Sequence, residues 1–91
     1  MRARRWDRTR VEHVATALRR CRLRRGTSQE RLGIKAGVAR TYVGRVERRL
    51  LCPTLLSMGR LLDALDVTWA EFGAVLDEEV VRPATPPRRR R

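Results

Sequence analysis

A chain of 91 residues, 42% of them hydrophobic, can form one small domain with a single core. Its two cysteines are too few and too far apart for a disulfide framework or a zinc cluster, and no apolar run is long enough to span a bilayer. Residues 1–49 carry 16 basic and four acidic side chains, whereas residues 50–81 carry one basic and six acidic side chains. This uneven placement of a net charge of +12 predicts one face that binds a polyanion.

The chain is predicted to start with a basic arm over residues 1–8, which either frays or lies along a polyanion. Thr9 and Glu12 have the spacing of a capping box, in which two side chains cap each other's backbone N–H groups. We therefore expect the first helix to start at Thr9 and to end at Gly26. The apolar stripe of this helix is formed by Val14, Leu18 and Cys21, while Arg24 and Arg25 lie off the stripe.

Residues 29–47 are predicted to form two short helices that meet at a sharp turn. Thr27 and Ser28 are both suited to cap the first of them, and Gly37 should end it because glycine readily adopts a left-handed φ. The second is expected over residues 39–48. The apolar side chains that should face a core across this unit are Leu32, Ala36, Val38, Val43 and Val46.

The open side of the helix over residues 39–48 is basic and carries an aromatic ring. Its side chains are Arg40, Thr41, Tyr42, Arg45 and Arg48. A basic helix that opens directly after a turn fits the major groove of double-stranded DNA, where arginine can donate two hydrogen bonds to a guanine edge. The alternative is an ordinary solvated helix face, which is common for charged runs.

Two further helices are predicted in the acidic half of the chain. Pro53 and Thr54 should start the fourth helix, and Thr68 with Glu71 forms a capping box that should start the fifth. The apolar positions of the fourth helix are Leu55, Met58, Leu61, Leu62 and Leu65.

The fifth helix is expected to supply both core and surface. We expect Trp69 and Phe72 to lie mostly in the core, and the later valines to be exposed enough to pair with a second copy of the chain. The predicted dimer interface is formed by Leu50, Leu51, Val75, Val80 and Val81. The domain is thus expected over residues 9–81, with a disordered tail rich in proline and arginine over residues 82–91.

These motifs, in this order, resemble the helix-turn-helix domains of the phage-repressor (Xre-type) family. The matching segments are Leu18-Arg19, Gly26-Thr27-Ser28-Gln29, Gly37-Val38, Tyr42-Val43 with Val46-Glu47, Pro53-Thr54, and Thr68 to Phe72. The resemblance covers most of the chain and implies an all-α, lambda-repressor-like domain of five helices that contains a helix-turn-helix.

The resemblance also implies roles for single residues. Arg22 would pair with Glu47 near the end of the reading helix, the alternative being two unrelated surface charges. Gln29 would donate a hydrogen bond to a DNA phosphate and brace Arg40. Arg40 and Arg45 would contact base edges.

Further contacts are expected around these base readers. Thr41 would touch a phosphate or a thymine methyl group, with Arg48 on the same face. Tyr42 would stack on a sugar or bond a phosphate, unless it is partly buried under the turn. Arg24 and Arg25 would contact phosphates without reading sequence.

The resemblance implies a cytoplasmic transcription regulator, a homodimer that reads an inverted repeat in double-stranded DNA through residues 39–48. The Arg40–Val43 segment, with Glu47 and Arg48, looks most like the controller proteins of restriction–modification systems, while phage repressors and antitoxins share the scaffold. The alternative is a protein-interaction module or antitoxin-type partner that binds another protein through the fifth helix. No cofactor, metal, membrane, small-molecule substrate or enzymatic activity is expected, because the sequence has no paired carboxylates, nucleophile–base set or metal-ligand cluster.

Overall fold

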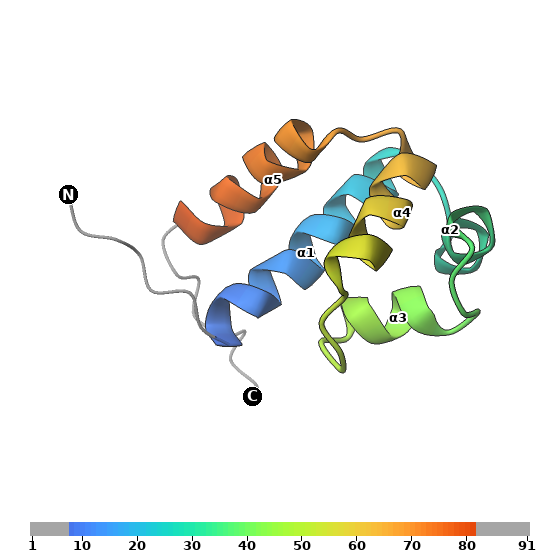
Figure 1. Ribbon diagram of the computed structural model, residues 1–91. Coiled ribbons are helices and arrows are strands. Elements are labelled where there is room, and N and C mark those ends of the chain that lie inside the picture. Colours follow the sequence, from blue (N-terminus) through green and yellow to red (C-terminus); the bar gives the residue numbers. More distant parts are fainter. Residues whose placement is uncertain (1–7, 82–91) are drawn as a thin grey trace, which may run out of the picture.

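The computed structural model describes residues 8–81, with the side chains of residues 11–80. It contains five helices, in the order α1 (Arg8–Arg24), α2 (Gln29–Ala36), α3 (Tyr42–Glu47), α4 (Leu55–Leu65) and α5 (Trp69–Val81) (Figure 1). Residues 8–81 form no strand, so the predicted all-α fold is confirmed. Residues 1–7 of the predicted basic arm and the predicted tail over residues 82–91 lie outside the described residues.

Helix α1 lies at the centre of the domain. It packs against α5 along one side and against α3 on another, while α2 packs against both α3 and α4 (Figure 1). The core between them is almost wholly aliphatic, as expected from a sequence with few aromatic residues. Its buried members are Ala17, Leu18, Cys21, Leu32, Ala36, Val43, Val46, Met58, Leu61, Leu62, Leu65, Phe72 and Val75.

The ends of α2 are set by local chemistry that the sequence predicts. Ser28, rather than Thr27, is the N-cap, and its side-chain oxygen accepts a hydrogen bond of 3.0 Å from the N–H of Arg31. Gly37 ends the helix at φ 74°, a left-handed conformation that glycine adopts without the penalty of a Cβ. The chain therefore reverses at Gly37, and this reversal sets the angle between α2 and α3.

Helices α4 and α5 also begin where the sequence predicts. The Thr54 side chain accepts a hydrogen bond of 3.0 Å from the N–H of Ser57. The Glu71 carboxylate accepts from the N–H of Thr68 at 2.8 Å, and the Thr68 hydroxyl accepts from the N–H of Glu71 at 3.0 Å, which completes the predicted capping box. The Thr68 N–H bond holds the pKa of Glu71 below its usual value. This cap is therefore lost as the pH falls through that lowered pKa.

Two helix starts differ from the prediction. Helix α1 begins at Arg8, so Thr9 lies inside the helix and cannot take the non-helical conformation of an N-cap. Helix α3 begins at Tyr42 rather than at residue 39, because Thr41 has φ −94° and ψ 0° and the Tyr42 N–H closes a turn onto the Ala39 carbonyl. Helix α3 is therefore shorter than the predicted span of residues 39–48.

Two predicted core residues lie on the surface. Leu55, at the first position of α4, is 77% exposed, because the core beneath this helix is filled from Met58 onward. Trp69 is 50% exposed, because it starts α5 beyond the edge of the core and lies over Gly59 of α4. Phe72 is buried as predicted. The predicted apolar stripe of α4 is wider than one helix face, and Leu55 is the residue of that stripe that is exposed to solvent.

The far end of α5 is fastened to α1 by an ion-pair cluster. The Arg20 guanidinium donates to Glu78 at 2.7 Å and to Glu79 at 2.8 Å. The hydrogen bonds to these two carboxylates raise the pKa of Arg20. The acidic residues near the end of α5 therefore hold the helix against the basic half of the chain.

Candidate nucleic-acid interface

Helix α3 is anchored to the core through one side and open on the other. Val43 and Val46 are fully buried, as predicted, and Val38 in the preceding turn packs against the same core. Tyr42 is half-buried against the core, which is the outcome expected if the ring sits partly under the turn. Helix α3 thus has a fixed orientation although it has only six residues.

The end of α3 is tied to α1 by the predicted ion pair. The Arg22 guanidinium donates to both oxygens of Glu47, from Nε at 2.7 Å and from Nη2 at 3.0 Å. Arg22 also donates from Nη1 to the Thr27 carbonyl at 2.8 Å, so one guanidinium joins α1, the α1–α2 loop and α3. The Glu47 side chain is only 2% exposed. A carboxylate buried this deeply needs such a partner, because unpaired charge is strongly disfavoured away from water.

Gln29 belongs to the same network, which differs from its predicted role. Its amide Nε2 donates to Glu47 Oε1 at 2.9 Å. The side chain therefore braces the end of α3 rather than Arg40 near its start, because Glu47 offers a charged acceptor. The amide nitrogen has a second N–H beyond the one given to Glu47. This contact depends on side-chain conformation and has no signal in the sequence pattern.

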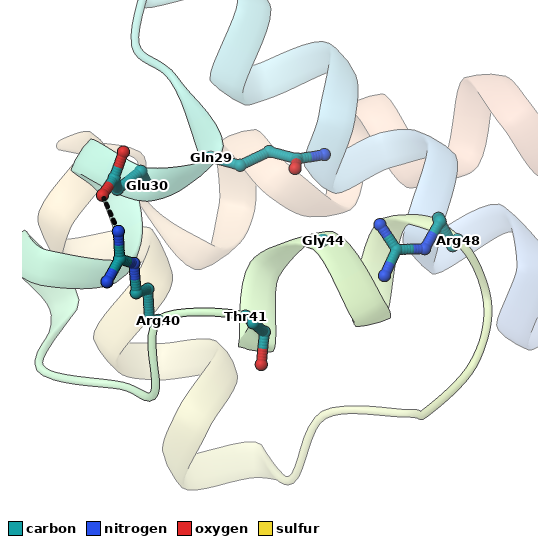
Figure 2. A pocket seen from close by; sticks show the side chains of 6 residues that line it. All are labelled: Gln29, Glu30, Arg40, Thr41, Gly44 and Arg48. Carbon is teal, nitrogen blue, oxygen red and sulfur yellow. Dashed lines mark ion pairs between the residues drawn. The ribbon is translucent and has the colours of Figure 1, made fainter.

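The outer side of α2 and α3 carries the predicted reading residues around a shallow hollow. Its lining residues are Gln29, Glu30, Arg40, Thr41, Gly44 and Arg48 (Figure 2). Arg40 is 80% exposed and pairs with Glu30 at 3.2 Å at one end of the hollow, while Arg48 folds back toward Gly44 at the other. Arg45 is also exposed. An exposed ion pair such as that of Arg40 contributes little and leaves the guanidinium available to a stronger partner.

Arg24 and Arg25 do not belong to this face. They are exposed side chains at the end of α1 beside the α4–α5 turn, where the Arg25 guanidinium donates to the Asp66 carbonyl at 2.7 Å. This turn lies at the opposite end of the domain from α3 (Figure 1). Both arginines are therefore placed apart from the hollow, because residues off an apolar stripe can still point in several directions. Their phosphate contacts stay a prediction.

The residues of the predicted dimer interface differ in their exposure. Val75 is 5% exposed and part of the core, so it is not available to a second subunit. Leu51 is half-buried against the core, and Val80 is half-buried on α5. Leu50 is exposed, and the side chain of Val81 lies outside the described residues.

A different apolar surface, which we call the α4–α5 face, is exposed beside α5. It is formed by Leu55, Leu56, Gly59 and Trp69. Leu55 and Leu56 lie one helical turn before Gly59, and the Trp69 ring lies over Gly59, which joins α4 to α5. The sequence analysis assigned Leu55 and Trp69 to the core and therefore missed this surface.

The described residues offer little else of functional chemistry. Cys21 is buried, and its burial raises the pKa of its thiol, which keeps the sulfur in the unreactive protonated form. Residues 11–80 contain no cluster of three side chains suited to hold a metal ion. No helix within residues 8–81 is long and apolar enough to cross a membrane.

Two of three comparisons place the chain among known proteins. A helix-turn-helix family model, HTH_3, matches residues 18–72. The crystal structure of the wild-type restriction–modification controller protein C.Esp1396I superposes with a TM-score of 0.78 at 27% identity, covering 81% of this chain and 96% of that one. Two mutants of the same controller protein give TM-scores of 0.79 at 26% and 25% identity, covering 81% and 82% of this chain and 99% and 95% of theirs. The comparison with curated proteins found no match.

Proposed function

The chain belongs to the helix-turn-helix family, and from this premise we propose that it is a DNA-binding transcriptional regulator and not an enzyme. The observation that supports it most is the arginine-bearing outer side of α3, held rigidly by the buried Arg22–Glu47 pair. A reading helix must present its side chains at a fixed angle to the groove. The buried pair supplies that rigidity, and it also neutralises the one carboxylate of α3, which would otherwise repel DNA.

The residues around the start of α3 are proposed to read the sequence. Arg40 and Arg45 donate to guanine edges in the major groove, and Thr41 contacts a phosphate or a thymine methyl group. The half-buried Tyr42 presents its hydroxyl to the DNA backbone. On this proposal the Arg40–Glu30 pair opens on binding, because a buried guanine contact outweighs an exposed ion pair.

The regulator is proposed to act as a homodimer on an inverted repeat. One short helix contacts too few base pairs to define a site in a genome, whereas two related by a two-fold axis read half-sites about 34 Å apart. The α4–α5 face supports this proposal, since exposed leucines beside a tryptophan are typical of an interface core. The subtype is proposed to be a restriction–modification controller, which the 25–27% identity to C.Esp1396I supports.

The same α4–α5 face supports a second candidate function. A protein-interaction module of the antitoxin type would use Leu55, Leu56 and Trp69 to bind a different protein. Sedimentation distinguishes the two, because the homodimer forms from the purified chain alone. A chain that is monomeric at tens of micromolar would favour the heterologous partner.

The test of DNA reading is Arg40→Ala. It is expected to weaken binding to an operator selected from a random DNA pool by about 1–3 kcal/mol and to affect random duplex much less. The measurement is affinity for both duplexes by fluorescence anisotropy. Arg24→Ala is the matched control, since it removes the same charge beside the α4–α5 turn and should leave the discrimination unchanged. Equal losses on both duplexes would reduce Arg40 to a phosphate contact.

A further inference from the structure

We infer that Gly44 is a positioning residue for DNA binding, because its missing side chain lets Arg48 fold over α3 and hold a DNA phosphate at the hollow beside Gln29. The inference rests on the proposed DNA-binding function and adds to it a residue that touches no DNA itself. It concerns one end of the hollow shown in Figure 2, where Gly44 forms the floor.

The backbone at Gly44 does not require glycine. The positive φ values of glycines within residues 8–81 occur at Gly26 and Gly37, so Gly44 has a conformation open to any residue. Glycine in a helix interior also weakens the helix relative to alanine, and α3 has only six residues. A residue that weakens the shortest helix of the domain needs another reason, and that reason is space.

The space above Gly44 is filled by two polar side chains. A Cβ at this position would lie 3.1 Å from Gln29 Oε1 and 3.2 Å from Arg48 Nη1. Both distances are shorter than ordinary van der Waals contact. Figure 2 shows the Arg48 guanidinium turned back toward Gly44 and the Gln29 amide approaching from α2. An alanine at position 44 would therefore crowd both side chains, and each would have to shift by at least a few tenths of an ångström.

Arg48 is the side chain that is free to move further. Gln29 is held by its 2.9 Å bond to Glu47, which is itself held by Arg22 in a buried pair. Arg48 is exposed, and within residues 11–80 it forms no ion pair. Swinging Arg48 outward thus breaks no buried bond, whereas moving Gln29 breaks one to a charged acceptor.

The group that fits this end of the hollow is a phosphate oxygen of the DNA backbone. Arg48 presents guanidinium N–H donors there, on the exposed side of the hollow. Arg48 follows the end of α3, whereas base reading falls to the residues at its start. The nearest carboxylate of the helix, Glu47, is already paired with Arg22. An anion held here contacts the backbone and fixes the depth of α3 in the groove.

The experiment is Gly44→Ala, with thermal unfolding and salt-dependent binding to a random-sequence duplex as the two readouts. The unfolding midpoint should stay level or rise by about 4 °C, the change expected from better helix propensity in a domain of this size. Affinity at 0.1 M salt should fall about eightfold, and the slope of log affinity against log salt should become shallower by about 0.9, as for one lost phosphate contact. Stability and binding therefore change in opposite directions.

Two further variants separate Gly44 from other causes. Gly73→Ala is the matched control, because a Cβ on this α5 glycine meets nothing within 4 Å, so the duplex affinity should not change. Arg48→Ala should reproduce the binding loss, and adding Gly44→Ala to it should cause no further loss, since the displaced side chain is already gone.

The outcomes separate this inference from the proposed function. A wild-type chain without salt-dependent duplex binding would overturn the function and the inference together. Duplex binding by wild type and Gly44→Ala with equal affinity would overturn only the inference. A lower unfolding midpoint for Gly44→Ala would also overturn it, because Gln29 would then be the side chain that moved. The inference would also be overturned if the losses of duplex affinity in Gly44→Ala and Arg48→Ala were additive in the double variant.

Discussion

Replacing Glu47 with alanine is expected to lower the free energy of unfolding by about 3–5 kcal/mol, the typical result of removing one partner of a buried ion pair. The Arg22 guanidinium would stay buried with both of its hydrogen bonds to Glu47 gone, and Gln29 would lose its acceptor. Small domains have only about 5–15 kcal/mol of stability in total. Urea unfolding followed by circular dichroism should thus show a much lower urea concentration at the unfolding midpoint, and DNA binding should weaken in parallel.

A double-mutant cycle tests whether the loss arises from the pair itself. Glu47→Ala combined with Arg22→Ala should be less destabilised than the sum of the two single variants, because the second change removes the charge that the first left unpaired. Arg19→Ala is the control on the exposed side of α1, where the same substitution should have little effect. Strict additivity between positions 22 and 47 would contradict the assigned role of the pair.

Disrupting the α4–α5 face is expected to have the largest effect on DNA binding. Leu55→Glu with Trp69→Glu should give folded monomers, because both side chains are largely exposed and Glu at the first position of a helix suits its dipole. Affinity for the selected operator should then fall by about a thousandfold, toward the non-specific level. Sedimentation velocity measures whether the variant is a monomer, circular dichroism measures whether it is folded, and fluorescence anisotropy measures its affinity for the operator.

The control places the same charge on an exposed apolar residue elsewhere. Leu23→Glu changes a half-exposed leucine on α1 that is not part of the α4–α5 face, and it should leave the dimer intact. Val75→Asp is not a test of association, since Val75 is in the core and the change should unfold the domain. If the Leu55 and Trp69 variant remained dimeric with full operator affinity, the interface would lie elsewhere.

The sequence predicted most of the features that depend on neighbouring residues, although the capping box of Thr9 and Glu12 does not start α1. The caps at Ser28, Thr54 and Thr68 and the left-handed Gly37 each need only a few adjacent residues, so their side-chain chemistry is visible in the chain. Spacing likewise gave the number and order of the helices. The Arg22–Glu47 contact, between residues distant in sequence, was anticipated from the family resemblance alone.

Features that depend on how the helices are placed could not be predicted in the same way. Periodicity showed that α4 and α5 have wide apolar stripes but not where the core ends, so Trp69 was assigned inward and Val75 outward. The hydrogen bond from Gln29 to Glu47 depends on side-chain conformation. The crowding above Gly44 depends on it too, because a glycine in a sequence carries no sign of what occupies the space beside it.

Helix α1 connects the helices that determine the spacing between half-sites in the proposed dimer. Arg20 fastens α5 to it and Arg22 fastens α3, from positions about 200° apart around the same helix. Both helices are therefore fixed to one rigid element, so α1 sets the position of α3 relative to α5. In the proposed dimer, substitutions in α3 should therefore change which bases are read, whereas loosening the contacts of Arg20 or Arg22 should relax the spacing allowed between half-sites.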